Sequence, residues 1–315
     1  MSYHSMCMMI TNECNIRCLM CGNPSINGAP TTVNKDVATK YIQSTKESSI
    51  NNVGFSGGEP FLHYSLLKEL VSVASSIGKS TSVMTNGYWA ENYSETVEIL
   101  FTLKNAGLNV CGVSFDEFHA DFIHKKNILN IIRAVKKVNM NIVIQSVILQ
   151  DSKPGDVINK LGEDIEGVNL LFIACCNTKN VIKRIDQKKF IRKTSPRGLF
   201  CGKSGSFSVE HNGTVRPCCN AFIFDTELVV GDINNNDVKK TIKAMKSNPF
   251  LYMLRNFGFD YFLGVVKKQS LNICVPENLT SSCELCSVLF STENYYTLLP
   301  YVYEDVKQLC ISKNL

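Results

Sequence analysis

The chain has 315 residues, of which 44% are hydrophobic and 19% charged, with 14 cysteines and a net charge of +5 at pH 7. Such a chain can bury a full core, which excludes disorder and collagen-like repeats, and it is too long for a mini-protein stapled by disulfides. Its mild charge is unlike the basic stripe of nucleic-acid-binding proteins, and it has no run of about 18 apolar residues to span a bilayer. We therefore expect no nucleic-acid or membrane partner.

The N-terminal segment, residues 1–10, lacks the basic stretch and long apolar run of a signal peptide. We therefore expect a cytoplasmic protein. In that reducing compartment, closely spaced cysteines indicate metal ligands or catalytic thiols rather than disulfides.

Short β-branched runs alternate with amphipathic stretches from Met6 to about Cys176. Strands are expected at residues 6–10, 52–56, 80–85, 109–115, 141–149 and 168–175. Helices are expected between them at residues 35–48, 64–77, 93–106, 123–138 and 154–161. Six β/α units favour a parallel sheet, because each crossover carries a helix. The predicted class is α/β, a partial (β/α)6 TIM barrel whose chemistry lies at the carboxyl ends of the strands.

The composition changes after Asn177, where a basic, polar stretch begins and the cysteine spacing becomes uneven. We place a domain boundary near residue 185, between a barrel, residues 1–185, and a C-terminal extension, residues 186–315. In the extension, helices are expected at residues 237–246 and 250–266, the second interrupted near Gly258.

Three cysteines, Cys14, Cys18 and Cys21, follow the first expected strand with the spacing C-x3-C-x2-C. Three thiolates on one short loop can bind three irons of a 4Fe-4S cluster and leave the fourth iron open to a chelating substrate. Structural zinc sites take four protein ligands in paired spacings, so this triplet fits zinc poorly.

The run Gly57-Gly58-Glu59-Pro60 ends the second expected strand. Two glycines let a backbone approach a ligand closely. Together with the cysteine triplet, this run resembles the radical S-adenosylmethionine (SAM) superfamily, whose second motif holds the methionine ammonium group of SAM. The resemblance implies a 4Fe-4S cluster on the triplet and SAM contacts from Gly57, Gly58 and Glu59.

The same resemblance suggests further SAM contacts. Met20 stands where the superfamily often has an aromatic residue against adenine, and a thioether can pack there. Ser114 and Asp116 share one face of the fourth strand and resemble the Ser-x-Asp ending of peptide-modifying members, although Asp116 could instead cap the next helix. Gln145 on the fifth strand is a further expected contact, as is Asn86, a residue type common in turns.

A second cysteine set lies in the extension: Cys201, Cys218, Cys219, Cys283 and Cys286. Neighbouring residues in an extended backbone point to opposite sides, so Cys218 and Cys219 cannot easily bind one cluster together. We expect Cys201, Cys218, Cys283 and Cys286 to hold an auxiliary 4Fe-4S cluster, with Cys219 facing the barrel. The alternative is that Cys219 is a small buried hydrophobic residue.

A closer resemblance runs nearly end to end. The matching segments are residues 55–59, 85–89, 115–120, 217–219, 254–255, 258–259 and 282–286. They resemble the radical SAM peptide epimerases of the epipeptide type, with a SPASM- or twitch-like auxiliary cluster region. The Pro-Cys-Cys element at 217–219 and the final C-x2-C narrow the resemblance to this group.

This resemblance implies conversion of L- to D-residues, of the valine or isoleucine type, in a ribosomally synthesised precursor peptide. The 5′-deoxyadenosyl radical from SAM would remove the Cα hydrogen, and the thiol of Cys219 would return hydrogen from the opposite face. An electron donor of the flavodoxin or ferredoxin type would be a second partner. We expect apolar burial to help Cys219 keep its S–H bond at neutral pH.

Some residues depart from the epimerase pattern. Ser206 stands where that pattern has an acidic residue, which puts epimerisation in question. Cys175, Cys176 and Cys274 have no counterpart, and one of the first two should face the barrel mouth as a rival hydrogen donor or simply as core. His119 is not expected to act as a base. The remaining cysteines are expected to pack in the interior: Cys7, Cys111 and Cys310.

Two other functions stay open. One is thioether or carbon–carbon crosslinking of a peptide, in which the auxiliary cluster would help to oxidise the product radical. The other is a non-catalytic zinc-binding or redox-sensing protein, which iron and sulfide analysis would exclude. Because the first expected strand begins at Met6, we expect the peptide to dock on the barrel and extension, or to be brought by a partner, rather than on an N-terminal leader-binding domain.

Overall fold

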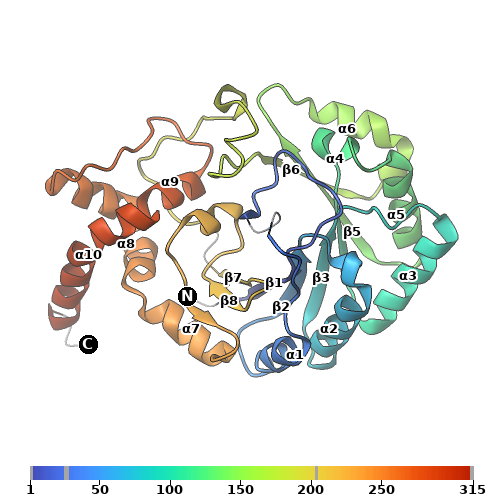
Figure 1. The fold of residues 1–315 in the computed structure, drawn as a ribbon, viewed down its shortest axis with the longest axis horizontal. Helices are drawn as coiled ribbons and strands as arrows, with labels where there is room; N and C mark the ends of the chain where they lie inside the picture. The colour runs from blue at the N-terminus through green and yellow to red at the C-terminus, as the bar shows by residue number, and fades with distance from the viewer. Residues whose placement is uncertain (1–2, 25–27, 203–204, 313–315) are drawn as a thin grey trace.

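The computed structural model describes residues 3–24, 28–202 and 205–312. Six parallel strands form the barrel region (Figure 1): β1 (Ser5–Thr11), β2 (Asn52–Gly57), β3 (Ser80–Thr85), β4 (Val110–Ser114), β5 (Asn141–Ile148) and β6 (Asn169–Ala174). Each pairs in parallel with the next, for example with Ser114 of β4 beside Gln145 of β5. The predicted α/β class is confirmed.

Helices surround these strands on the outside (Figure 1): α1 (Lys35–Gln43), α2 (Tyr64–Ser76), α3 (Tyr93–Ala106), α4 (Glu117–Ala120), α5 (Lys125–Lys137) and α6 (Pro154–Leu161). In α5, Ile128, Ile131 and Val135 recur at helical spacing and are buried. Helix α3 ends at Gly107, whose φ is +106° and where a Cβ would lie 2.0 Å from Ser75 Oγ. Only glycine fits there.

The sheet continues beyond β1 into the extension. Strand β7 (Ser206–Val209) pairs in parallel with β1, and β8 (Thr214–Arg216) and β9 (Gly231–Asp232) follow in antiparallel. The order is β6-β5-β4-β3-β2-β1-β7-β8-β9. The sequence indicates a return strand before Cys218 but not the pairing of β7 with β1. This pairing covers the edge of β1 and brings the segment after β8 next to the barrel.

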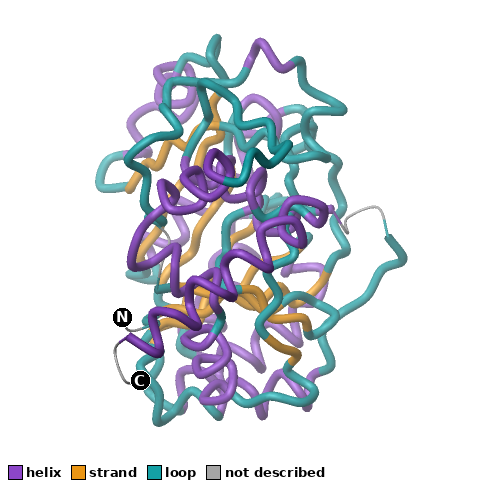
Figure 2. The backbone as a smooth tube through the Cα atoms, turned by 90° about the vertical axis from the view of Figure 1, so that its left-hand side faces the viewer, coloured by secondary structure: helices purple, strands orange, loops and turns teal. Residues whose placement is uncertain are grey.

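The described part of the extension also contains the helices α7 (Val238–Ser247), α8 (Pro249–Lys268), α9 (Ser282–Leu289) and α10 (Thr292–Ser312). Figure 2 views them from the side, in front of the strands. The predicted interruption of α8 at Gly258 is confirmed, with φ of +70° and ψ of −166°. Phe250 stacks on Tyr295, with ring centroids 4.2 Å apart, and so ties α8 to α10.

Short 3-10 helices connect these elements: η2 (Pro60–His63), η3 (Gly162–Ile165), η4 (Gln187–Lys189) and η5 (Ala221–Asp225). Among the described residues, none of the helices is both long enough and apolar enough to cross a bilayer.

Candidate active site

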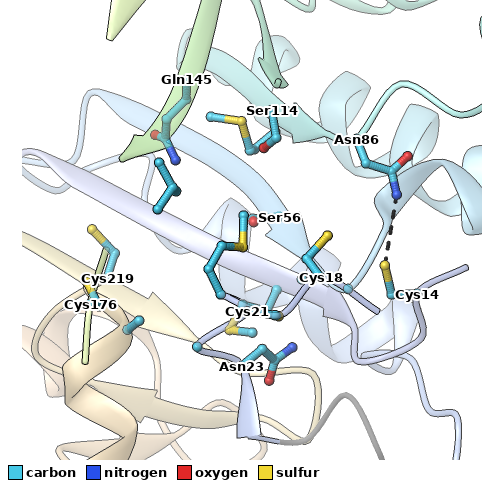
Figure 3. A pocket seen from close by; sticks show the side chains of 18 of the residues that line it. Cys14, Cys18, Cys21, Asn23, Ser56, Asn86, Ser114, Gln145, Cys176 and Cys219 are labelled. Atoms are coloured by element: carbon cyan, nitrogen blue, oxygen red, sulfur yellow. Dashed lines mark hydrogen bonds between the residues drawn. The ribbon is translucent and has the colours of Figure 1, made fainter. Parts of the chain in front are cut away.

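A cavity of about 320 Å³ lies at the carboxyl ends of the barrel strands. Residues on or just after β2, β3, β4 and β6 line it, and β7 and the segment after β8 supply part of the wall. Figure 3 shows the side chains around it. The cavity is therefore built jointly by the barrel and the extension.

All three cysteines of the triplet line this cavity. Burial raises the pKa of Cys18 to about 12, and the neighbouring thiols of Cys21 and Cys14 contribute in the same direction. In the described part of the chain, no three cysteine, histidine or carboxylate side chains already stand in the arrangement of a bound metal ion. The donor set itself, three thiols on one loop at one cavity, fits a cluster with one open iron.

Two arginines support the backbone of the cysteine loop. Arg17 donates to the carbonyl oxygens of Cys14, at 2.5 Å, and Ile16, at 3.0 Å. Arg184, in the segment after β6, donates to the carbonyl oxygens of Cys18, at 3.1 Å, and Cys21, at 2.5 Å. Arg184 could not be predicted from the sequence, because only the fold brings it to a loop more than 160 residues earlier.

Gly57 and Gly58 dock the end of β2 against the segment that leads into the cysteine loop. Gly58 N donates to Thr11 O and Glu59 N to Glu13 O, both at 2.7 Å. A Cβ on Gly58 would lie 1.9 Å from Glu13 O. Both glycines also line the cavity, so the lack of side chains there serves the loop packing and leaves backbone open to a ligand.

Glu59 lies behind the cavity wall rather than on it. Its carboxylate accepts hydrogen bonds from Phe61 N at 3.0 Å, Thr85 Oγ1 at 2.8 Å and Asn86 N at 2.7 Å. Burial raises the pKa of Glu59 to about 7, although these three donors lower it. Asn86 in turn donates to Asn15 Oδ1 at 2.9 Å and contacts Cys14 Sγ at 3.9 Å (Figure 3).

Met20, Ser114 and Gln145 also line the cavity. Asp116 does not, in contrast to the expectation that it faces a ligand. Its side chain caps α4 by accepting from Phe118 N and His119 N, and it also accepts from Val147 N, each at 3.0 Å. Capping is the alternative that the sequence left open.

His119, which was not expected to act as a base, lines the cavity wall. Its Nδ1 lies 2.8 Å from Asp116 Oδ1, and the ring is largely buried. Asp116 therefore fixes the orientation of a ring that borders the cavity.

The second cysteine set divides between two cavities. Cys201, Cys218, Cys283 and Cys286 line one pocket with apolar side chains, including Phe222, Leu251 and Phe259. Burial raises the pKa of Cys286 well above the usual value, and the other three thiols act in the same direction. Four thiols that face one apolar pocket fit an auxiliary iron–sulfur cluster.

Cys219 lines the barrel cavity instead, at a distance along the wall from Cys14 (Figure 3). Its Sγ lies 3.4 Å from Ser206 Oγ, while Ser208 Oγ donates to Cys218 O at 2.7 Å. Two serines of β7 thus hold the Cys218–Cys219 pair between the two cavities. Cys219 is exposed to solvent, so the expected apolar burial is wrong.

Two further thiols, Cys7 and Cys176, line the barrel cavity. Cys7 was expected to pack, yet it alternates along β1 with the buried Met6 and Met8, and this signal could have placed it on the cavity face. Burial raises the pKa of Cys7 to about 12, with a smaller contribution from Cys219.

The other unassigned cysteines lie elsewhere. Cys175 is buried, so of the pair after β6 only Cys176 faces the cavity. Cys111 is buried as expected, whereas Cys310, expected to pack, is exposed. Cys274 is also exposed.

Comparison with protein families accounts for both halves of the chain. The radical SAM superfamily matches residues 8–158, and the SPASM iron–sulfur cluster-binding domain matches residues 201–286. The chain therefore contains a radical SAM domain followed by a SPASM domain. Its cofactors are SAM and two iron–sulfur clusters.

Individual relatives cover different parts of the chain. The Bacillus subtilis protein YydG, described by its name as a peptide biosynthesis protein, is 27% identical over 301 residues, 93% of this chain and 94% of YydG. A probable GTP 3′,8-cyclase of Methanococcus maripaludis is 29% identical over 131 residues, 41% of this chain and 42% of the cyclase. A solved structure of anSMEcpe with bound AdoMet has a TM-score of 0.57 at 15% identity and covers 96% of this chain and 98% of its own. The likeness to anSMEcpe therefore extends the fold over both domains.

Proposed function

We propose that the protein is a radical SAM peptide epimerase that converts L- to D-residues, of the valine or isoleucine type, in a ribosomally synthesised peptide. The likeness to YydG over nearly the full length of both chains supports a role in peptide modification. The observation that carries the proposal is that Cys218 and Cys219 open into different cavities. This separation supports a role in metal binding for Cys218 and a role at the proposed SAM cavity for Cys219.

The proposed roles follow from these positions. Cys14, Cys18 and Cys21 hold the catalytic cluster. The backbone of Gly57 and Gly58 contacts SAM, and Glu59 and Asp116 act from behind the wall by orienting Asn86 and His119. The side chains expected to contact SAM directly are Met20, Asn86, Ser114 and Gln145. The auxiliary cluster is held by Cys201, Cys218, Cys283 and Cys286.

The reaction needs one hydrogen removed and one returned. When bound and reduced, a cluster held by Cys14, Cys18 and Cys21 would supply the electron that cleaves SAM to methionine and a 5′-deoxyadenosyl radical. The Cα–H bond of an L-residue breaks, and that hydrogen passes to the 5′ carbon. The S–H bond of Cys219 then breaks, and its hydrogen forms a new Cα–H bond on the opposite face. The sulfur regains one electron from the reductant, a protein of the flavodoxin or ferredoxin type, and one proton from solvent, to which Cys219 is exposed.

The test is anaerobic incubation in deuterated water with the small peptide encoded beside this gene, followed by chiral amino-acid analysis. Each inverted residue should carry one deuterium, because a thiol hydrogen exchanges with solvent. The variant Cys219→Ala should still form 5′-deoxyadenosine and yield no D-residues, whereas Cys274→Ala, which removes an exposed thiol elsewhere, should behave like the parent protein. Full epimerisation by Cys219→Ala would remove Cys219 from this role and point to Cys176.

Peptide crosslinking is the second candidate, and the apolar four-cysteine pocket favours it, because a cluster there could accept the electron of a product radical. A thioether or carbon–carbon bond would lower the peptide mass by two hydrogens. Loss of two hydrogens with no deuterium uptake would overturn the epimerase proposal and support crosslinking.

A further inference from the structure

A second cavity, of about 730 Å³, lies beside the candidate active site. Ile16 lines both cavities and so forms part of the wall between them. Asn15 lines only the second. These two residues stand between Cys14 and Cys18 in the sequence, so this cavity adjoins the loop that carries the triplet.

The opposite side of this cavity carries positive charge. It is formed by the segment from Phe122 to Asn127, where α5 begins. Lys125 and Lys126 are exposed and neither forms an ion pair within the described chain. The side chain of His124 makes no capping hydrogen bond, so the positive end of the helix dipole adds to both lysines. Among the described residues that line the cavity, Glu91 is the one carboxylate.

Apolar surface lies beside these cations. Phe122 is 48% exposed and lines the cavity, together with Ile16 and Tyr88. Aromatic side chains such as Phe122 are enriched in protein–protein interfaces, where a polar rim surrounds them.

We propose that this cavity and its rim, the α5 docking surface (Asn15, Ile16, Tyr88, Glu91 and residues 122–127), bind an acidic one-electron carrier protein that reduces the catalytic cluster. The inference rests on the proposed assignment of the triplet to that cluster. Positive charge on this face attracts and orients an acidic partner. One electron passes from the carrier through the cysteine loop, with no bond made or broken at the surface.

The location of the α5 docking surface would keep the reductant apart from SAM and the peptide. SAM and the peptide must reach the cavity that contains Cys219, and Ile16 stands between that cavity and the α5 docking surface. A carrier bound at α5 therefore approaches the cluster from the outside while the active site stays filled. An acidic segment of the precursor peptide is the competing occupant, and the experiment distinguishes the two.

The test reverses both charges in Lys125→Glu/Lys126→Glu and compares two reductants, a reduced acidic flavodoxin and dithionite. The matched control is Lys267→Glu/Lys268→Glu, which makes the same change in net charge at the exposed end of α8. The readouts are bleaching of the visible cluster absorbance and formation of 5′-deoxyadenosine. With flavodoxin at low salt, we expect the α5 variant to be slower by at least about 10-fold, the lower range of electrostatic steering. With dithionite its rates should equal those of the parent protein.

Salt provides a second measurement. The flavodoxin-dependent rate of the parent and of the α8 control should fall steeply with ionic strength, whereas that of the α5 variant should change little. Equal flavodoxin rates in parent and variant would overturn the proposal. A loss with both reductants, or a raised KM for the peptide with dithionite, would overturn it in favour of peptide docking. Since neither readout requires D-residues, failure of the epimerase proposal would be seen separately.

Discussion

The two cysteine sites of this protein are built in opposite ways. At the barrel mouth, one loop supplies three cysteines to the wall of a cavity of about 320 Å³, among polar side chains such as Asn86 and Ser114. In the extension, three separate segments supply four cysteines to a pocket lined by phenylalanine and leucine. As cluster ligands, three thiols beside open space would leave a coordination position for a substrate, whereas four thiols in an apolar pocket would leave none. The difference suggests that ligand number and surrounding space, rather than cysteine content, separate the reactive site from the supporting one.

The largest expected effect comes from removing one cysteine from each site and comparing the two variants. Cys18→Ala should abolish formation of 5′-deoxyadenosine, because the triplet has no spare thiol. Cys286→Ala should retain measurable SAM cleavage and lose close to half of the bound iron and sulfide. Iron, sulfide and 5′-deoxyadenosine assays on both variants, each reconstituted anaerobically, give the comparison.

Thermal unfolding provides the control for this pair. Cys286→Ala should unfold at a lower temperature than Cys18→Ala, because the four-cysteine pocket joins segments that are distant in the sequence. Normal SAM cleavage by Cys18→Ala would contradict the assignment of the open site. Loss of all iron from Cys286→Ala would show that the two sites do not form independently.

An intermediate effect is expected from replacing either of two arginines, one of which supports each cysteine site. Arg184 donates to the carbonyl oxygens of Cys18 and Cys21, and Arg192 lies 2.9 Å from Glu284, which stands between the cysteines of α9. Removal of such supporting groups typically costs about 10–100-fold in metal affinity or activity. Arg184→Met should therefore slow SAM cleavage by about that factor while the auxiliary cluster stays bound.

The matched variant is Arg192→Met, which should lower iron retention by the extension and leave SAM cleavage within about twofold, because its contacts lie at the other site. Iron-release rates in the presence of a chelator measure both effects. Similar losses of SAM cleavage in the two variants would indicate a general loss of stability rather than separate support of two sites.

Local sequence patterns were sufficient for much of this architecture. The alternation of strands and helices gave the parallel sheet, and the break at Gly258 followed from one glycine in a helical stretch. The triplet lies on one short loop and the Gly57–Gly58 run packs against neighbouring backbone. Short sequence motifs are therefore enough to locate both. Their roles as ligands stay predictions.

Features that depend on distant contacts could not be predicted in the same way. The pairing of β7 with β1 and the support from Arg184 both require the folded sheet. Asp116 illustrates a different limit of prediction from sequence, because an aspartate at this position could either contact a ligand or cap the next helix. Only the hydrogen bonds from Phe118 N, His119 N and Val147 N show that its oxygens are already used.

The smallest predicted effect concerns Ser206, the residue that links the two sites through β7. Its hydroxyl lies 3.4 Å from the Cys219 thiol, a contact worth about 0.5–1.5 kcal/mol if it behaves like a typical hydrogen bond. Ser206→Ala should therefore reduce the yield of D-residues per SAM cleaved by roughly 2–12-fold, because the thiol is less well oriented, and should leave the 5′-deoxyadenosine rate unchanged. Ser208→Ala is the comparison on the same strand: its hydroxyl contacts Cys218 O and not the Cys219 thiol, so we expect a smaller loss of D-residues than from Ser206→Ala. Ser206→Asp restores the acidic residue of the epimerase pattern. A yield of D-residues above that of the parent would show that the serine weakens an otherwise intact epimerase. An unchanged ratio of D-residues to SAM cleaved in both Ser206 variants would show that this contact does not position Cys219.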